Sequence, residues 1–222
     1  MNKVIVITGA TGALGTLTAK TFAAQGHSLA LLDHDQNKLD VLTRDLNLPD
    51  ERLFTSAIDL RNAQAVHDSA EAVTKKFNSI HALIHLVGGW TGGKAIAESN
   101  ADDLTSMLDQ HVWTTFHLFQ AFSSNLAASK AGRVIVVSKS TVPKPTGKEG
   151  IYSAAKAAQE NLVLTLAAEL KESGVTANII QVRMIDVDNK GKGTTPAEIV
   201  AAMQYLFSDA AGKITGTRIP LY

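Results

Sequence analysis

Apolar and polar positions follow two patterns that alternate along the chain. Apolar runs are typical of strands buried on both faces of a parallel sheet, and they predict strands over 3–7, 28–32, 81–87 and 132–137. Two further strands with interspersed polar residues are expected at 53–58 and 175–182. Apolar residues at helical spacing lie between them, over 14–26, 37–46, 62–77, 102–128, 152–173 and 195–206, and a last short strand is expected at 217–221. Strands that alternate with helices predict an α/β fold, a three-layer doubly wound parallel sheet.

Composition limits the classes of protein that this chain can belong to. The 222 residues are 45% hydrophobic and contain no Pro/Gly-rich linker, which predicts a single domain over 1–222. Cysteine is absent, so disulfides, a thiolate nucleophile and cysteine metal sites are excluded. Lys plus Arg equals Asp plus Glu at 21 each, and no apolar run reaches the length of a membrane span. We therefore expect a cytoplasmic protein with a small-molecule substrate and no nucleic-acid or membrane partner.

A glycine-rich turn joins the first strand to the first helix. Its sequence is TGATGALG over residues 8–15. Gly9 allows the chain to leave the strand, Gly12 allows a pyrophosphate to approach the backbone, and Gly15 allows the helix to pack against the sheet. The free N–H groups of such a helix start favour a phosphate, so the turn predicts a Rossmann-type dinucleotide site.

The second predicted strand ends on Asp33. A carboxylate at this point accepts hydrogen bonds from the adenosine ribose hydroxyls and repels a 2′-phosphate. The sequence therefore predicts NAD(H) in preference to NADP(H).

Two further segments follow predicted strands and end at the same edge of the sheet. Residues 88–93, Gly-Gly-Trp-Thr-Gly-Gly, have the backbone freedom of a loop beside a ligand. Residues 138–141, Ser-Lys-Ser-Thr, follow the fifth strand. Ligands of open α/β sheets bind at this edge. His85 lies within an apolar strand, where a buried neutral imidazole is the expected state.

Tyr152 and Lys156 lie one helical turn apart and on the same face. An ammonium ~4 Å from a phenolate, at an effective dielectric of ~20, stabilises it by about 4 kcal/mol. About half of that energy lowers the pKa of tyrosine from about 10 to near 8. The pair is therefore predicted to act as an acid and base near neutral pH.

The turn, Asp33, Asp59, the glycine-rich loop and the YSAAK helix together resemble the short-chain dehydrogenase/reductase family. The resemblance implies that Tyr152 donates or accepts the proton, that Lys156 binds the nicotinamide ribose and lowers the pKa of Tyr152, and that Asp59 and Leu60 meet the adenine. The expected cofactor-binding residues are Gly9, Thr11, Gly12, Ala13, Leu14, Gly15, Asp33, Asp59, Leu60, Val87, Gly88, Gly89, Tyr152, Lys156 and Ile185.

The sequence departs from the family pattern at several of its functional positions. Ala13 stands where the commonest pattern has its middle glycine, and His111 stands where the family has an asparagine. The catalytic serine position falls on Lys139, between Ser138 and Ser140. A one-residue bulge could bring either hydroxyl into place, and we expect Ser140 to serve because it lies past the strand.

Two interpretations of function follow from these observations. The leading one is an oxidoreductase that moves a hydride between NAD(H) and a small carbonyl, quinonoid or alcohol substrate. Residues 88–93 and 112–114 resemble the dihydropteridine reductase branch of the family, which favours a pterin-type substrate. The alternative, suggested by Lys139 and His111, is a catalytically weak dinucleotide-binding sensor or scaffold. The broad apolar surface of the 102–128 helix predicts a homodimer or homotetramer formed through the 102–128 and 152–173 helices.

Overall fold

One parallel sheet organises the chain in the computed structural model, which describes residues 2–222. Within these residues the sheet has seven strands in the order β3-β2-β1-β4-β5-β6-β7. All neighbouring strands are parallel. The strands are β1 (Val4–Thr8), β2 (Ser28–Asp33), β3 (Leu53–Ala57), β4 (Ala82–His85), β5 (Arg133–Lys139), β6 (Thr176–Val182) and β7 (Arg218–Pro220).

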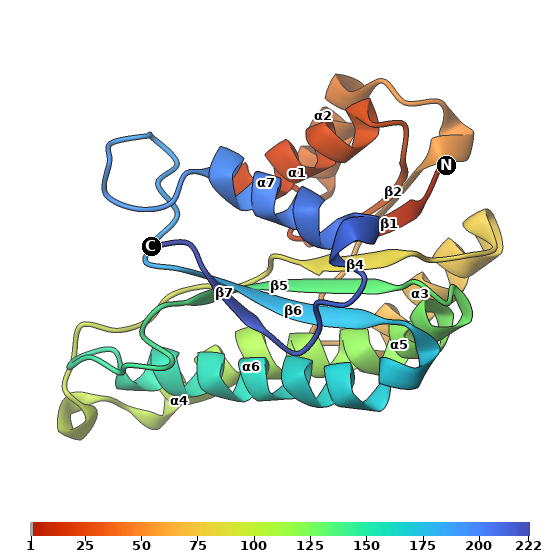
Figure 1. The fold of residues 1–222 in the computed structure, drawn as a ribbon. Coiled ribbons are helices and arrows are strands. Elements are labelled where there is room, and N and C mark those ends of the chain that lie inside the picture. Colours follow the sequence, from red (N-terminus) through yellow and green to blue (C-terminus); the bar gives the residue numbers. More distant parts are fainter. Residues whose placement is uncertain (1) are drawn as a thin grey trace.

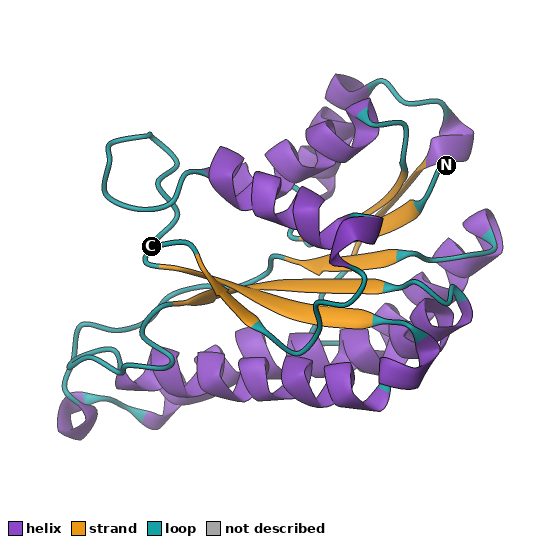
Figure 2. Ribbon diagram, viewed as in Figure 1, coloured by secondary structure: helices purple, strands orange, loops and turns teal. Residues whose placement is uncertain are grey.

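Helices cover both faces of this sheet, as Figures 1 and 2 show. They are α1 (Ala13–Ala24), α2 (Gln36–Leu46), α3 (Ala63–Phe77), α4 (Ala101–Leu108), α5 (Thr114–Ala128), α6 (Gly150–Glu169) and α7 (Pro196–Phe207). Helices α1, α2 and α7 lie on one face, and α3, α5 and α6 lie on the other. The three-layer doubly wound fold predicted from the sequence is confirmed.

Successive residues of each strand face opposite sides of the sheet and so build two separate cores. In β1, Ile5 and Ile7 face the core under α1 and α7, whereas Val6 faces the core over α5 and α6. All three are fully buried. The central strands are apolar throughout because both of their faces are covered.

Side chains cap several helix starts. The Asn62 carboxamide oxygen accepts the Ala65 N–H at the start of α3. Thr195 and Glu198 form a reciprocal capping box at the start of α7, where Pro196 takes the first turn. Such local signals explain why these boundaries could be found in the sequence.

The predicted continuous helix over 102–128 is wrong in one respect. A π-helical turn over Asp109–Trp113 separates α4 from α5. The hydroxyls of Thr114 and Thr115 donate to the carbonyls of Gln110 and His111, which supports the wider turn. Helical π turns often occur at functional sites, and this one carries His111 into the interior.

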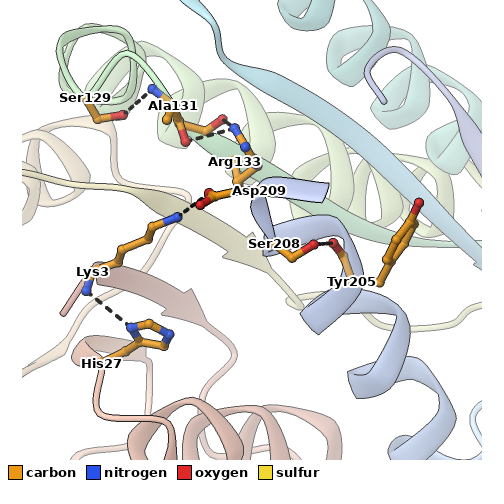
Figure 3. A network of polar contacts seen from close by, with 9 residues as sticks. Lys3, His27, Ser129, Ala131, Arg133, Tyr205, Ser208 and Asp209 are labelled. Carbon is orange, nitrogen blue, oxygen red and sulfur yellow. Dashed lines mark hydrogen bonds and ion pairs between the residues drawn. The ribbon is translucent and has the colours of Figure 1, made fainter. Parts of the chain in front are cut away.

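Polar contacts connect the segments at the N-terminal ends of the strands (Figure 3). Lys3 Nζ lies 3.0 Å from Asp209 Oδ1, and the Lys3 N–H donates to His27 Nδ1 over 3.2 Å. Arg133 Nη1 donates to the Ala131 carbonyl over 2.9 Å. These contacts lie opposite the sheet edge where the loops after β4, β5 and β6 gather (Figure 1). Among residues 2–222, none of the helices has the length and hydropathy needed to cross a bilayer.

Candidate active site

A groove crosses the C-terminal ends of the strands. It consists of two adjoining cavities of about 560 and 550 Å³, and Gly9, Gly12, Leu86, Val87 and Gly88 line both of them. One cavity extends to Asp33, and the other extends to Tyr152. All of the residues expected to bind cofactor line one cavity or the other. Strand β4 was predicted to extend to residue 87, but it ends at His85. The chain leaves the sheet after His85, and residues 86–90 line the groove.

The glycine turn forms the middle of the groove floor. Gly9 has φ +68°, and a Cβ there would lie 3.2 Å from the backbone of Leu86 and Val87. A Cβ on Gly15 would lie 2.1 Å from the Gly9 carbonyl oxygen, so helix α1 packs directly on the turn. At Gly12 the nearest atom to such a Cβ is the Gly9 carbonyl oxygen at 3.5 Å, an ordinary van der Waals distance, so the chain itself leaves room for a side chain there.

The start of α1 suits an anion. No side chain caps it, and its first turn carries no acidic residue. Gly12, Ala13, Leu14 and Gly15 all line the groove. The unpaired N–H groups and the positive end of the helix dipole therefore lie beside this cavity, where a pyrophosphate would be stabilised.

Asp33 is fixed at the other end of the groove. Its Oδ2 accepts the Thr11 N–H over 2.9 Å and the Thr11 hydroxyl over 2.8 Å, and its Oδ1 accepts the His34 N–H over 2.8 Å. Only 6% of the residue is exposed. The Asp35 N–H at 3.4 Å and His34 Nδ1 at 3.0 Å also contact Oδ1, so the carboxylate is held rigidly where it lines the cavity. A ribose hydroxyl that bound here would share or replace the longer of these contacts.

The cations at this end are paired with carboxylates. Arg61 forms a bidentate pair with Asp59, at 2.7 and 2.9 Å, and this contact holds the pKa of Asp59 below its ordinary value. Lys38 Nζ lies 3.4 Å from Asp35 Oδ2. Asp59 was expected to meet the adenine; its carboxylate lines the cavity while bound to Arg61.

Tyr152 and Lys156 enter the second cavity from α6, as their spacing predicted. The expected lowering of the pKa of Tyr152 does not occur in this structure. Burial, and after it the Glu149 carboxylate, raises this pKa to about 12. Lys156 Nζ donates instead to the Val137 carbonyl over 3.0 Å and to Gln159 Oε1 over 2.8 Å.

Gln159, which the sequence motifs did not indicate, is a direct hydrogen-bond partner of Lys156. It connects Lys156 to Thr115, whose hydroxyl accepts from Gln159 Nε2 over 2.8 Å. Both Gln159 and Lys156 are buried, and burial lowers the pKa of Lys156 to about 8. Its position three residues after Lys156, on the same helical face, was the available signal.

His111 packs edge-on against Tyr152, with ring centroids 5.4 Å apart. Burial, and after it the charge of Lys156, lowers its pKa to about 3, so the imidazole is neutral. Its Nε2 lies 3.0 Å from the Gly89 carbonyl oxygen, and this carbonyl can only accept, so Nε2 carries the proton. Its Nδ1 is thus an acceptor, and it has no hydrogen-bond partner among residues 2–222.

The structure separates the two candidate serines. Ser138 is buried and lines the cavity, and within the described chain its hydroxyl has no hydrogen-bond partner. Ser140 lies outside the cavity lining, and its N–H donates to the Val182 carbonyl. Strand β5 extends to Lys139 without a bulge, so the expected shift that would bring Ser140 inward is absent.

The mouth of the cavity is apolar and partly exposed. Trp90, Met184, Ile185 and Val187 line it and are between 37% and 58% exposed. Asp186 holds the loop that carries three of them, because its carboxylate accepts the N–H groups of Lys190 and Lys192. This loop therefore forms one wall of the entrance.

A parallel α/β sheet with a glycine turn and a Tyr/Lys pair in one groove defines a dinucleotide-dependent class of protein. A model of the short chain dehydrogenases matches residues 3–197. The chain belongs to this family, as its motifs predicted, and is an oxidoreductase of a family that uses nicotinamide cofactors.

Individual relatives are distant. An uncharacterized oxidoreductase of Staphylococcus epidermidis is 28% identical over 83% of this chain and 78% of its own length. Meso-2,3-butanediol dehydrogenase of Serratia marcescens is 27% identical over 99% of this chain and 93% of its own. The solved structure of a short-chain type dehydrogenase/reductase from Mycobacterium ulcerans has a TM-score of 0.92 at 20% identity, covering 100% of this chain and 88% of that one. It shares the fold.

Proposed function

We propose that this protein is an NAD(H)-dependent oxidoreductase in which Tyr152 moves the proton to or from a small carbonyl, quinonoid or alcohol substrate. The observation that carries the proposal is the continuous groove from Asp33, over the glycine turn, to Tyr152 and Lys156. An extended dinucleotide fits such a groove, with its adenosine at Asp33, its pyrophosphate at the start of α1 and its nicotinamide near Tyr152.

The preference for NAD(H) rests on the charges at the adenosine end. Asp33 would accept from ribose hydroxyls and would repel a 2′-phosphate. Arg61 and Lys38 could attract that phosphate, but each is paired with a carboxylate. Pairing with the phosphate would require breaking one of these contacts.

A nicotinamide bound in this groove would supply or accept the hydride at the carbonyl carbon, and residues of this chain would transfer the accompanying proton. With a pKa of about 12, Tyr152 is protonated at neutral pH, which suits donation to a substrate oxygen during reduction. The free hydroxyl of Ser138 is the better placed of the two serines to polarise the carbonyl. Lys156 has a third N–H available for the nicotinamide ribose.

The assembly that we propose is a homodimer or homotetramer through the helices over 102–128 and 152–173. Leu104, Trp113 and Phe116 are 38%, 50% and 37% exposed on the first of these segments. A second copy that covers them would remove this apolar surface from water. In sedimentation velocity, the wild-type chain should sediment as a dimer or tetramer. A monomer would contradict this proposal.

Cofactor titration and single-turnover absorbance test the function. NADH should bind at least tenfold more tightly than NADPH, and Asp33→Ser should remove this difference. Bound NADH should then be oxidised by at least one compound from a panel of aldehydes, diketones, oxo acids and quinonoid dihydropterins. A protein that binds NADH but oxidises it with none of these would be the sensor or scaffold, and the enzymatic proposal would be lost.

A further inference from the structure

Cationic side chains line the cavity beside Tyr152. Lys139, Lys156 and Arg183 line it, and no aspartate or glutamate does so within residues 2–222. The neighbouring histidine, His111, is neutral and adds no charge. A cofactor supplies negative charge at its pyrophosphate, but that group would lie at the α1 end of the same cavity.

Lys139 lies beside Tyr152, and the proposed function assigns it no role. It is the last residue of β5, and its Nζ is 5.5 Å from the centroid of the Tyr152 ring. Its side chain is 19% exposed, and Nζ lies 2.9 Å from Glu149 Oε1. An ammonium has three N–H donors, so the contact with Glu149 leaves two of them free to bind another group.

The other two cations have different surroundings. Lys156 Nζ donates to Val137 and Gln159 and faces the ribose position of the proposed function. Arg183 is exposed where the Tyr152 cavity adjoins a separate, third cavity lined by Lys192, Glu198 and Tyr222. It makes no ion pair with any residue that the structure describes. Arg183 can therefore add long-range attraction for an anion that enters, while Lys139 makes the direct contact.

We propose that Lys139 binds a carboxylate of the substrate, so that the enzyme interconverts a short 2- or 3-oxo acid and the corresponding hydroxy acid. This inference rests on the proposed function, which places the carbonyl at Tyr152. In reduction, the carbonyl carbon gains a hydride from NADH and its oxygen gains a proton from Tyr152. NADH becomes NAD⁺, and the carboxylate is unchanged.

The geometry favours a short distance between the two groups of the substrate. Because Nζ lies over the Tyr152 ring, a carboxylate bound there would be only a few bonds from a carbonyl at the phenol. The apolar mouth formed by Trp90, Met184 and Val187 would accommodate a short hydrocarbon chain on the other side. A larger neutral heterocycle would leave Lys139 without a new partner.

The test compares each acid with its own methyl ester. The probes are 2-oxobutanoate, 3-oxobutanoate and their methyl esters, with kcat/KM measured from NADH oxidation in the wild-type protein, Lys139→Met and Glu149→Gln. We expect each acid to exceed its ester by at least tenfold in the wild type. Loss of a hydrogen bond to a charged group costs about tenfold to a hundredfold, so Lys139→Met should reduce the acid-to-ester ratio by that amount.

Glu149→Gln is the matched control, because it removes the competing carboxylate and leaves Lys139 in place. The acid-to-ester ratio should rise several-fold, opposite to the effect of Lys139→Met. If the Lys139–Glu149 pair only held the loop after β5, both variants would change acids and esters alike, and the inference would be overturned. Esters that react as well as acids in the wild type would overturn it too.

A binding measurement separates failure of this inference from failure of the proposed function. The acids are titrated into the protein–NADH complex and followed by tryptophan fluorescence. Acid binding that weakens in Lys139→Met, with no NADH oxidised by any compound, would support the anion site and overturn the enzymatic function. Oxidation of NADH by the esters alone would support the enzymatic function and overturn the carboxylate site at Lys139.

Discussion

Gly12 and Gly15 should respond in different ways to the same substitution by alanine. At Gly15 the new Cβ would lie 2.1 Å from the Gly9 carbonyl oxygen and 2.8 Å from two backbone atoms of Ala10. Backbone cannot move aside as a flexible side chain can, so the cost lies at the upper end of overpacking effects, about 3 kcal/mol or more. This is a large part of the ~5–15 kcal/mol that stabilises a typical domain.

At Gly12 the physical situation is reversed. Its φ of −67° suits any residue, and the nearest atom to a new Cβ is 3.5 Å away. Gly12→Ala should therefore change the free energy of unfolding by less than about 1 kcal/mol, because the reduced conformational freedom of the unfolded chain offsets the weaker capping by alanine at this N-cap position. The methyl group would project into the groove, so NADH affinity should fall at least tenfold.

Urea unfolding and NADH fluorescence titration measure the two effects separately. Gly15→Ala should show a lower unfolding midpoint, and Gly12→Ala should show a midpoint close to that of the wild type with weak NADH binding. If Gly12→Ala bound NADH as tightly as the wild-type protein, the assignment of the pyrophosphate to this turn would be refuted. If Gly15→Ala were as stable as the wild type, the packing argument would be refuted.

Three further predictions concern other parts of the molecule. Tyr152→Phe should lower the single-turnover rate by about a hundredfold to ten-thousandfold and leave the Kd for NADH unchanged in a fluorescence titration; equal rates would remove the phenol from the mechanism. Burial lowers the pKa of both His85 and His111 from 6.5 to about 3, so below pH 6.5 only the unfolded chain binds these two protons. Each group should lower the free energy of unfolding by about 2 kcal/mol between pH 7 and pH 5, about 4 kcal/mol together. Urea titrations at both pH values check this, with His85→Gln expected to show a smaller fall. Arg218→Met should cost about 3 kcal/mol in thermal unfolding because it leaves the fully buried Glu160 without its cation, whereas Glu160→Gln should cost less because Arg218 is 41% exposed; equal losses would contradict this reasoning.

Features that depend on short stretches of sequence could be predicted. The alternation of apolar runs and helical spacing predicted the three layers of the fold. The glycine turn and Asp33 predicted where the groove lies and which of its ends faces the adenosine. The helices predicted over 62–77 and 195–206 begin within one residue of the observed α3 and α7, where Asn62 and Thr195 are the N-caps. Each of these signals acts through neighbours in the chain, so a single sequence contains it.

Features that depend on contacts between distant segments could not be predicted from the sequence. Tyr152 and Lys156 lie on one face by spacing alone, but the direction of the Lys156 ammonium depends on Val137, which belongs to another element. The π turn at His111 likewise depends on the loop carrying Gly89, to which the imidazole donates.

The sequence by itself determined that this chain forms a doubly wound sheet with a dinucleotide turn, because local periodicity and backbone sterics suffice for both. Only the tertiary structure decided that Ser138 rather than Ser140 lines the cavity and that Lys139 lies over Tyr152. The physical reason is that strand pairing sets where β5 ends and which way its last side chains point. The sequence pattern did not show whether a one-residue bulge would form at this end of β5, and the pairing with β6 leaves none.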